Sequence, residues 1–195
     1  MTETAAKPAA QRLFFALWPN PVTAQALRNA QQAVCQSGGR LLHPDDLHLT
    51  LVFLGDVAAE RLPCVQAAAE QVRVPPFDLT LTRHGYWRGP RVTWLAPEQT
   101  PQPLTALVDQ LWTGLAVCGY SREARPFSAH LTLARKARPQ TTAALETPVN
   151  WHADSFVLAA SASDGRLPRY RLLGRWPLAA TGAEWESATQ AGKID

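Results

Sequence analysis

Short apolar runs with the length and alternation of β strands recur along the first half of the chain. They lie at residues 12–18 (RLFFALW), 47–55 (LHLTLVFLG), 77–87 (FDLTLTRHGYW) and 91–96 (RVTWLA). Gly and Pro lie between several of these runs, as expected of strands separated by turns. We therefore predict four strands in this half of the chain.

Helical spacing appears between these strands. Apolar residues recur every three or four positions over 22–33, 62–72 and 104–115, which is the pattern of one buried helix face. Ser37, Gly38 and Gly39 follow the first segment, and Gly119 follows the third. Glycine is a common residue just beyond a helix end. The sequence thus predicts three helices between strands.

The tetrapeptide H-L-T-L occurs twice, at 48–51 and 130–133, and both copies lie in strand-like runs. Because side chains alternate across a strand, His and Thr of each copy share one face, and the two Leu residues share the other. Two further runs, 155–162 and 169–178, are predicted to form an antiparallel pair joined by a loop at 165–168. The repeated motif predicts an internal duplication with a pseudo-twofold axis.

Two histidines of this kind are suited to acid–base chemistry. Imidazole has an unperturbed pKa near 6.5, so one ring can accept a proton while the other donates one. Thr50 and Thr132, one strand period beyond His48 and His130, can donate hydroxyl protons to the oxygens of a tetrahedral anion such as phosphate. A single H-x-T is more often a hydrogen-bonded pair in a half-buried strand, but two copies favour catalysis.

Composition adds little to this picture. The chain has 195 residues, 46% of them hydrophobic and 18% charged, which fits one domain or two small lobes. The net charge is +3, and 16 of the 19 basic residues are Arg. Arg binds phosphate through a planar fork, so this usage is compatible with a phosphate-bearing ligand. Compositional drift explains it equally well.

The cysteines and the apolar segments indicate a location. Cys35, Cys64 and Cys118 are odd in number and form no C-x-x-C pattern, so we expect neither a disulfide framework nor a zinc site. The run LFFALW is too short for a membrane span or a signal sequence. We expect a reduced cytoplasmic protein that does not associate with membranes.

Other candidate residues carry weaker signals. Asp45 and Asp46 could join His48 and His130 at a metal, but no H-x-H, H-E-x-x-H or paired-carboxylate spacing is present, so we expect metal-free chemistry. Phosphate-binding loop and dinucleotide motifs are also absent from the sequence. Three groups are left out of the predicted site: His43, His84 and His152; the aromatic residues Phe14, Tyr86, Trp87 and Tyr170, which could stack on a base; and the basic residues Lys136 and Arg138.

With both motifs in view, the chain resembles the 2H phosphoesterase superfamily, and within it the bacterial RNA 2′,3′-cyclic phosphodiesterases, also called 2′-5′ RNA ligases. The resemblance extends over about residues 11–178, from RLFFAL through LHLTLVFLG and RPFSAHLTLAR to YRLLGRWPL. It implies an α+β bilobal fold, with two small, mostly antiparallel sheets backed by helices around a central cleft. Residues 1–10 and 179–195 are expected to be disordered tails.

The resemblance also implies the roles of individual residues. His48 is expected to be the proton donor and His130 the proton acceptor, while Thr50, Thr132 and Arg135 bind the substrate without metal or cofactor. The implied reaction is hydrolysis of an RNA 2′,3′-cyclic phosphate end, or of a cyclic nucleotide, to a 2′-phosphomonoester. The short apolar surface expected of a two-lobed cleft enzyme favours a monomer. Two alternatives stay open: a 2′-5′ ligase that runs the reaction in reverse, and a module that binds terminal phosphates without catalysis.

Overall fold

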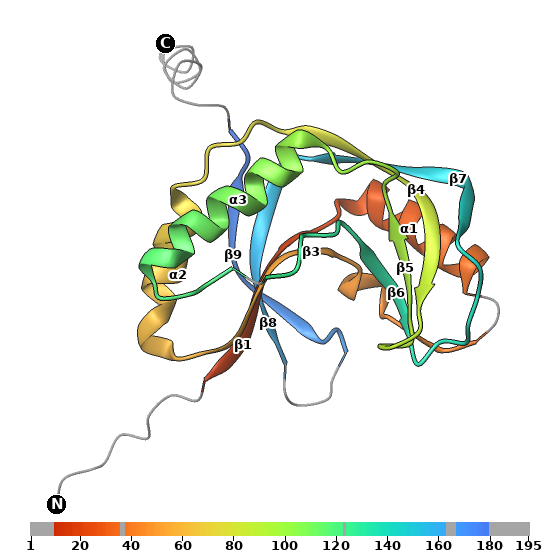
Figure 1. The fold of residues 1–195 in the computed structure, drawn as a ribbon, viewed down its shortest axis with the longest axis horizontal. Helices are drawn as coiled ribbons and strands as arrows, with labels where there is room; N and C mark the ends of the chain where they lie inside the picture. The colour runs from red at the N-terminus through yellow and green to blue at the C-terminus, as the bar shows by residue number, and fades with distance from the viewer. Residues whose placement is uncertain (1–9, 36–37, 123, 163–166, 180–195) are drawn as a thin grey trace, which may run out of the picture.

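The fold is known from a computed structural model that describes residues 10–35, 38–122, 124–162 and 167–179 (Figure 1). The predicted tails at 1–10 and 179–195 lie outside these ranges, apart from residues 10 and 179. Within the described ranges, no helix combines the length and the apolar character needed to cross a membrane.

The predicted strands and helices follow one another along the chain in the predicted order. The elements are β1 (Gln11–Leu17), α1 (Pro21–Val34), β2 (Arg40–Leu41), η1 (Pro44–Asp46), β3 (Leu49–Val57), η2 (Ala59–Arg61), α2 (Leu62–Glu70), β4 (Phe77–Trp87), β5 (Val92–Ala96), α3 (Gln102–Val117), β6 (Leu131–Arg135), β7 (Ala143–Ala153), β8 (Ser155–Ser161) and β9 (Tyr170–Pro177). All the predicted strands and helices are present, with ends shifted by a few residues.

The strands form two lobes that meet at one residue pair. The sheet runs in the order β7-β4-β5-β6-β3-β1-β8-β9, with β2 beside β6. Its centre is the antiparallel contact of β3 with β6, where the paired residues are Leu49 and Leu131. We call β3, β1, β8 and β9 the first lobe and β7, β4, β5 and β6 the second lobe. Each lobe therefore contributes one strand with the H-x-T motif.

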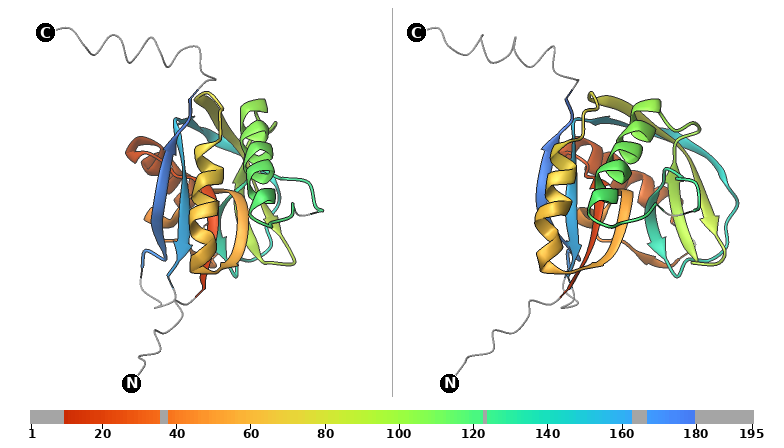
Figure 2. Two further views of the ribbon diagram at one scale, coloured as in Figure 1. Left: turned by 90° about the vertical axis from the view of Figure 1, so that its left-hand side faces the viewer. Right: turned by 60° about the vertical axis from the view of Figure 1, so that its left-hand side comes forward.

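Each lobe is backed by helices. α1 packs against β7 of the second lobe, whereas α2 packs on α3 and β9, and α3 packs on β3 of the first lobe. Figures 1 and 2 show α2 and α3 together on one side of the molecule and α1 behind β4 and β5. The predicted α+β bilobal fold is confirmed. The two expected sheets are joined into one path at the Leu49–Leu131 pair, and the internal duplication stays a prediction.

The alternation of β1 explains how the first lobe is built. Leu13, Phe15 and Leu17 face the main core, where each is at most 1% exposed. Phe14 and Ala16 point to the opposite face and pack with residues of β8 in a second, smaller apolar cluster. Both faces of β1 are therefore buried, and only the second face adjoins the H-x-T residues.

The helix ends have the expected local causes. The Asn20 side chain accepts a hydrogen bond of 2.9 Å from the backbone N–H of Thr23, which caps α1 directly before Pro21. Gly119 has a φ of +80°, and the backbone N–H of Tyr120 donates to the carbonyl of Leu115. This left-handed conformation favours glycine, and it ends α3 where the sequence predicts.

The strand β7 is missing from the predictions. It pairs with β4 along most of its length, but only Val149, Trp151 and Ala153 are buried along it. Its first half is polar or exposed and contains Pro148. The alternation is therefore confined to the last few residues, which is too short a signal for a strand of this length.

The prediction that the cysteines form no disulfide is wrong. Cys64 in α2 and Cys118 at the end of α3 are joined by a disulfide, with their Cα atoms 5.8 Å apart. The two residues are separated by 54 positions, and they come together because α2 packs against α3. The spacing of the cysteines in the sequence does not indicate that these two helices pack together. Cys35 is the free cysteine of the described chain.

Candidate active site

The two H-x-T motifs lie side by side at the junction of the lobes. Leu49 of β3 pairs with Leu131 of β6 in antiparallel register, and His48 and His130 are the residues that directly precede these two strands. Thr50 and Thr132 directly follow the paired leucines. The structure thus brings together the two strand starts that carry the four residues selected from the sequence.

Both imidazoles are held in the same way. The Nδ1 atom of His48 lies 2.6 Å from the carbonyl oxygen of Asp46, and the Nδ1 atom of His130 lies 2.8 Å from that of Ser128. A carbonyl oxygen only accepts, so Nδ1 must carry the proton and donate it. The neutral rings therefore have their lone pair on Nε2, which leaves that atom to exchange protons with a substrate.

His48 is surrounded by aromatic rings. Trp18 stacks on it almost in parallel, with ring centroids 5.1 Å apart, while Phe14 and Tyr170 lie 4.9 and 5.0 Å away. Loss of water around the ring lowers the pKa of His48 to about 4, against the opposing effect of the hydrogen bond to Asp46. The unliganded protein therefore keeps this imidazole neutral at pH 7.

His130 has a similar but less enclosed environment. Trp87 contacts its ring edge-on, at a centroid distance of 4.5 Å. Burial lowers the pKa of His130, and the positive charges of Arg125 and Arg135 lower it further, while the bond to Ser128 acts in the opposite direction. Both imidazoles of the site are thus biased toward the neutral form, as a proton acceptor requires.

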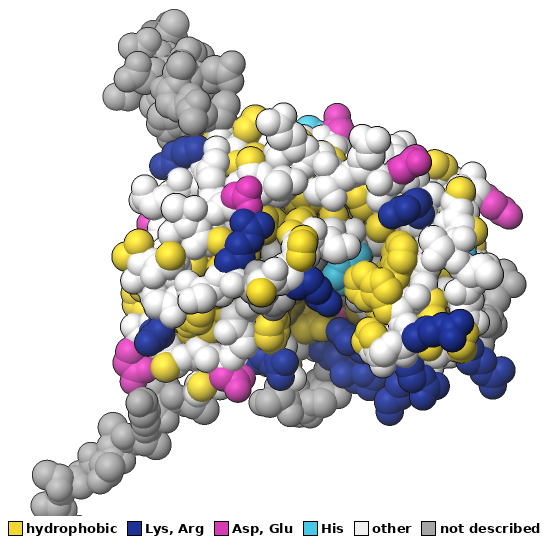
Figure 3. All heavy atoms as spheres, in the orientation of Figure 1, with side chains coloured by type: hydrophobic (Ala, Val, Ile, Leu, Met, Phe, Trp, Pro, Cys, Tyr) yellow, Lys and Arg dark blue, Asp and Glu magenta, His cyan; other side chains and the backbone are white. Residues whose placement is uncertain are grey.

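A pocket of about 530 Å³ opens beside His130. Thr50 and His130 line it together with Trp87, Trp112 and Arg125, so β3, β4, α3 and the segment before β6 all contribute. Aromatic walls and a guanidinium suit a nucleoside next to a phosphate. Figure 3 shows a histidine side chain at the bottom of a hollow on this face, with Lys and Arg side chains around it.

Arg135 lies at the far end of β6 from His130. It is exposed, and it lines a second pocket rather than the one beside His130. Its positive charge nevertheless lowers the pKa values of both His48 and His130. Arg135 therefore acts electrostatically on both imidazoles, and the same field attracts an anion to the space between them.

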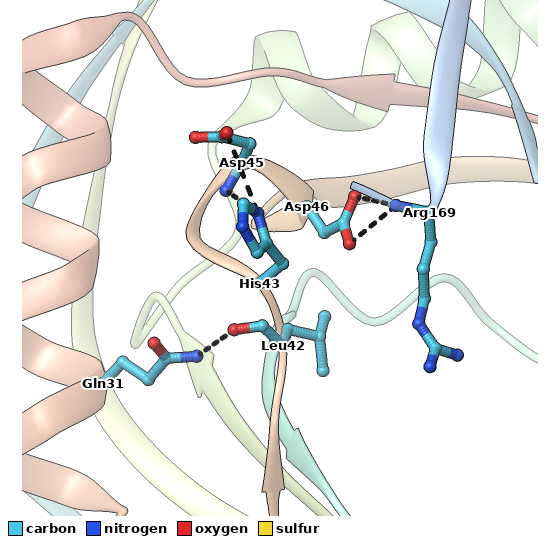
Figure 4. A network of polar contacts seen from close by, with 6 residues as sticks. All are labelled: Gln31, Leu42, His43, Asp45, Asp46 and Arg169. Atoms are coloured by element: carbon cyan, nitrogen blue, oxygen red, sulfur yellow. Dashed lines mark hydrogen bonds and ion pairs between the residues drawn. The ribbon is translucent and has the colours of Figure 1, made fainter. Parts of the chain in front are cut away.

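Asp46 connects His48 to β9. Its carboxylate, 1% exposed, accepts hydrogen bonds of 2.9 and 3.0 Å from the backbone N–H of Arg169, while its carbonyl receives the His48 proton. Figure 4 shows the Arg169 guanidinium directed away from Asp46. Since Tyr170 follows Arg169 and contacts the His48 ring, Asp46 fixes both the imidazole and one of its neighbours.

On the second lobe, Gln31 of α1 has a comparable structural role. Its side-chain amide donates to the carbonyl of Leu133 in β6 at 2.8 Å and to that of Leu42 at 3.1 Å. Figure 4 shows the bond to Leu42. A primary amide has two N–H donors, so one side chain supports both strands. α1 thereby fixes the strand that follows His130.

Several residues of the site have no role that the sequence predicts. Phe14, Trp87 and Tyr170 are candidates for base stacking on sequence alone, yet they contact the histidines themselves. Trp18 and Asp46 are absent from the predicted site. Trp18 has a usable signal, because it lies two positions after Ala16 and four after Phe14 and so shares their face of the chain. Ala16 is the residue of β1 that pairs with Thr50. The role of Asp46 depends on a contact with Arg169, far away in the sequence. No sequence signal indicates that contact.

The remaining candidates lie elsewhere. Tyr86 donates weakly to the carbonyl of Ala137 at 3.4 Å. His43 lies near Asp45, and His152 is hydrogen-bonded to Asp78. His84 has a buried Nδ1 without a partner in the described structure. Nowhere in the described ranges do three or more His, Cys, Asp or Glu side chains gather as a metal site would need.

Comparison with known proteins agrees with the two motifs. Residues 16–164 match the family model of the 2′-5′ RNA ligase superfamily. The RNA 2′,3′-cyclic phosphodiesterase of Escherichia coli is 37% identical over 172 residues, which is 86% of this chain and 97% of that protein. The protein of the same name from Thermus thermophilus is 31% identical over 185 residues, 86% of this chain and 90% of the relative.

Solved structures agree with the sequence comparison. The crystal structure of E. coli LigT complexed with 3′-AMP has a TM-score of 0.79 at 34% identity, and covers 87% of this chain and 98% of that one. TT0787 of T. thermophilus has a TM-score of 0.74 at 28% identity, with 88% and 100% coverage. The resemblance drawn from the two motifs is therefore confirmed, and this chain belongs to the 2′-5′ RNA ligase superfamily.

Proposed function

We propose that this protein hydrolyses the 2′,3′-cyclic phosphate at the end of an RNA, leaving a 2′-phosphomonoester and a free 3′-hydroxyl. The observation that carries this proposal is the pair of imidazoles at the starts of the two motif strands, which meet at the Leu49–Leu131 pair, each with Nδ1 bound to a carbonyl. The relatives named RNA 2′,3′-cyclic phosphodiesterase support the same reaction.

The reaction needs one proton taken and one given. A water molecule attacks phosphorus while Nε2 of His130 removes its proton, and the bond from phosphorus to O3′ breaks as Nε2 of His48 protonates O3′. Thr50 and Thr132 donate hydrogen bonds to the non-bridging oxygens, where negative charge grows. Arg135 adds a positive charge that stabilises the same oxygens.

The buried environment of His48 affects its role as donor. With a pKa of about 4 in the unliganded protein, it carries few protons at pH 7. A bound phosphate anion favours the imidazolium, since opposite charges nearby raise the pKa of a histidine. Proton uptake by His48 therefore accompanies substrate binding in this mechanism.

The first test is turnover of a 2′,3′-cyclic nucleotide by His48→Ala and His130→Ala variants after treatment with EDTA. Each substitution should lower kcat by about 10² to 10⁴, the usual contribution of a general acid or base. His152→Ala, which removes an exposed histidine of β7, is the control and should retain activity. Wild-type activity that returns only when a divalent metal is added contradicts the metal-free mechanism.

Product analysis separates the proposal from its alternatives. A hydrolase yields a new 2′-monoester, a ligase joins the cyclic phosphate to a 5′-hydroxyl and yields a longer strand, and a binding module leaves the substrate intact. The ligase is included because the matching family model is named for that activity.

A second test assigns the two proton transfers. A leaving group that bears negative charge easily needs no general acid, and a 3′-bridging sulfur is such a group. On a 3′-thio cyclic substrate, His48→Ala should recover most of its lost rate, while His130→Ala should stay about 10² or more below wild type, because it still lacks a base. Rescue of His130→Ala instead would exchange the two roles.

RNA as the physiological substrate, the monomeric state and the cytoplasmic location belong to the same proposal. The expectation of a cytoplasmic location rests in part on unpaired cysteines, and the Cys64–Cys118 disulfide removes that argument. Light scattering of the purified protein tests the monomeric state, and fractionation of the cells tests the location.

A further inference from the structure

A second pocket, of about 280 Å³, lies next to the residues that hold His48. Tyr170, whose ring contacts His48, and Asp46, which binds its Nδ1 proton, both line it. Three arginines from distant parts of the chain complete its wall: Arg40 of β2, Arg135 of β6 and Arg169 just before β9. We call this the arginine pocket.

The three guanidinium groups have no acidic partner among the described residues. Asp46, the carboxylate in the wall, is bound to the backbone N–H of Arg169, and Figure 4 shows the Arg169 side chain extending away from it. The ion pair of Arg122 with Asp109 lies elsewhere, beside α3. The arginine pocket therefore has a surplus of positive charge.

Two of these arginines are opposed to each other. Arg40 and Arg135 are direct partners in the β2–β6 ladder. Like charges directly opposite one another destabilise a sheet, because their side chains lie close together. An anion between the two guanidinium groups would remove this repulsion, and the forked donors of Arg suit a phosphate.

The arginine pocket is adjacent to His48, because Tyr170 and Asp46 belong to its wall and also contact that histidine. Arg135 lines the pocket and its charge acts on both imidazoles, and Tyr170 separates the pocket from His48 by one aromatic ring. Figure 3 shows Lys and Arg side chains gathered below the central hollow on this face. The arginine pocket therefore offers a second group of phosphate-binding side chains next to the residues that hold His48.

We infer that the arginine pocket binds a phosphodiester of the RNA chain next to its terminal cyclic phosphate, through Arg40 and Arg169 together with Arg135. This inference rests on the proposed function and extends it: the protein acts on RNA ends in preference to single cyclic nucleotides. The recognised feature is the sugar–phosphate backbone, so the preference is independent of base sequence.

The test compares kcat/KM for a dinucleotide with a 2′,3′-cyclic end and for the corresponding cyclic mononucleotide. Wild type should favour the dinucleotide by about 10-fold or more, the value of one charge-assisted hydrogen bond. The double variant Arg40→Gln/Arg169→Gln should lose most of this preference. The control, Arg28→Gln/Arg171→Gln, has the same net charge and alters arginines outside the pocket, so it should keep the preference.

A binding measurement makes the test independent of turnover. The affinity of a fluorescent RNA pentamer ending in a 2′-phosphate is measured over a range of salt concentrations. The pocket variant should bind about 10-fold more weakly, and its slope of log affinity against log salt should fall by about 0.7 for each phosphate that the variant no longer neutralises. The control variant should match wild type.

The outcomes are distinct. Equal kcat/KM of wild type for both substrates, or pocket and control variants that behave alike in turnover and binding, would overturn the inference. If wild type hydrolyses neither substrate, the proposed function fails, and the binding experiment still decides whether the arginine pocket holds RNA. Melting temperatures of both double variants show whether each protein is folded.

Discussion

At the scale of single residues, the surroundings of His48 determine both its protonation and its effect on the stability of the fold. The ring lies among Phe14, Trp18 and Tyr170, which exclude water that would otherwise solvate the imidazolium. A histidine whose pKa falls on folding binds protons less readily in the native state than in the unfolded state. Folding and protonation therefore oppose each other at this position.

This opposition predicts how stability depends on pH. The pKa of His48 is about 4 in the folded protein and about 6.5 in an unfolded chain. The unfolded state gains the proton first as pH falls through 6.5, so the folded state loses stability between pH 6.5 and 4. The loss at pH 5 relative to pH 7.5 should be about 2 kcal/mol from this residue.

Urea denaturation at pH 7.5 and pH 5 measures this effect. We expect His48→Asn, which has no titrating ring, to lose about 2 kcal/mol less than wild type over this interval. His152→Asn is the control, because that side chain is exposed on β7, and it should lose nearly as much as wild type. Parallel losses in wild type and His48→Asn would show that burial does not lower the pKa of His48.

Sequence identified the chemical groups of the site but not their supports. His48, Thr50, His130 and Thr132 share a short local pattern, and alternation along a strand is enough to place each pair on one face. Tyr170 contacts the His48 ring, and the Asp46 carboxylate binds the backbone N–H of Arg169, so both supports join segments far apart in the chain. Pairing of segments is a tertiary property, so no local pattern could assign these roles.

At the scale of elements, the position of β6 depends on a helix that precedes it by about a hundred residues. Gln31 of α1 is 4% exposed and donates to carbonyls of Leu133 and Leu42. Gln31→Ala removes both donors and leaves buried carbonyl groups with fewer partners. Such a loss costs about 1–3 kcal/mol.

We therefore expect Gln31→Ala to lower the free energy of unfolding by that amount in urea denaturation. Gln32→Ala is a matched control, since Gln32 is the next residue of α1 and is exposed. It should change stability by less than about 0.5 kcal/mol. If both substitutions have the same effect, the amide bonds of Gln31 do not anchor β6.

Elements with regular patterns were predictable, and β7 was not. β1 contains a continuous apolar run, β4 alternates between buried and exposed residues over its first half, and α3 has apolar residues at helical spacing. β7 is largely exposed along its first half and is held in place by pairing with β4. An exposed strand has no buried face to select apolar residues, so its sequence resembles a loop.

At the scale of the whole molecule, the disulfide joins two helices of the same side. Cys64 and Cys118 close a loop with a sequence separation of 54. Closing a loop of this size restricts the unfolded chain and should add about 4 kcal/mol of stability in the chain-entropy model. The bond depends on how α2 and α3 pack, so the spacing of the cysteines in the sequence does not indicate it.

Denaturation with and without reducing agent tests this contribution. Wild type should lose about 4 kcal/mol on reduction, and Cys64→Ser/Cys118→Ser should resemble the reduced protein. Cys35→Ser, which removes the free cysteine of the described chain, should remain as sensitive to reduction as wild type. Stability that does not respond to reduction would show that the bond does not form in solution.

The order of the strands also has a consequence for how the protein is made. β1, near the start of the chain, forms its ladder with β3 on one side and with β8 on the other, and β8 in turn pairs with β9. During synthesis, the edge of β1 that pairs with β8 stays unpaired until nearly the whole chain has left the ribosome. Until then the nascent protein has an unpaired, largely apolar strand edge, which is a feature that favours aggregation.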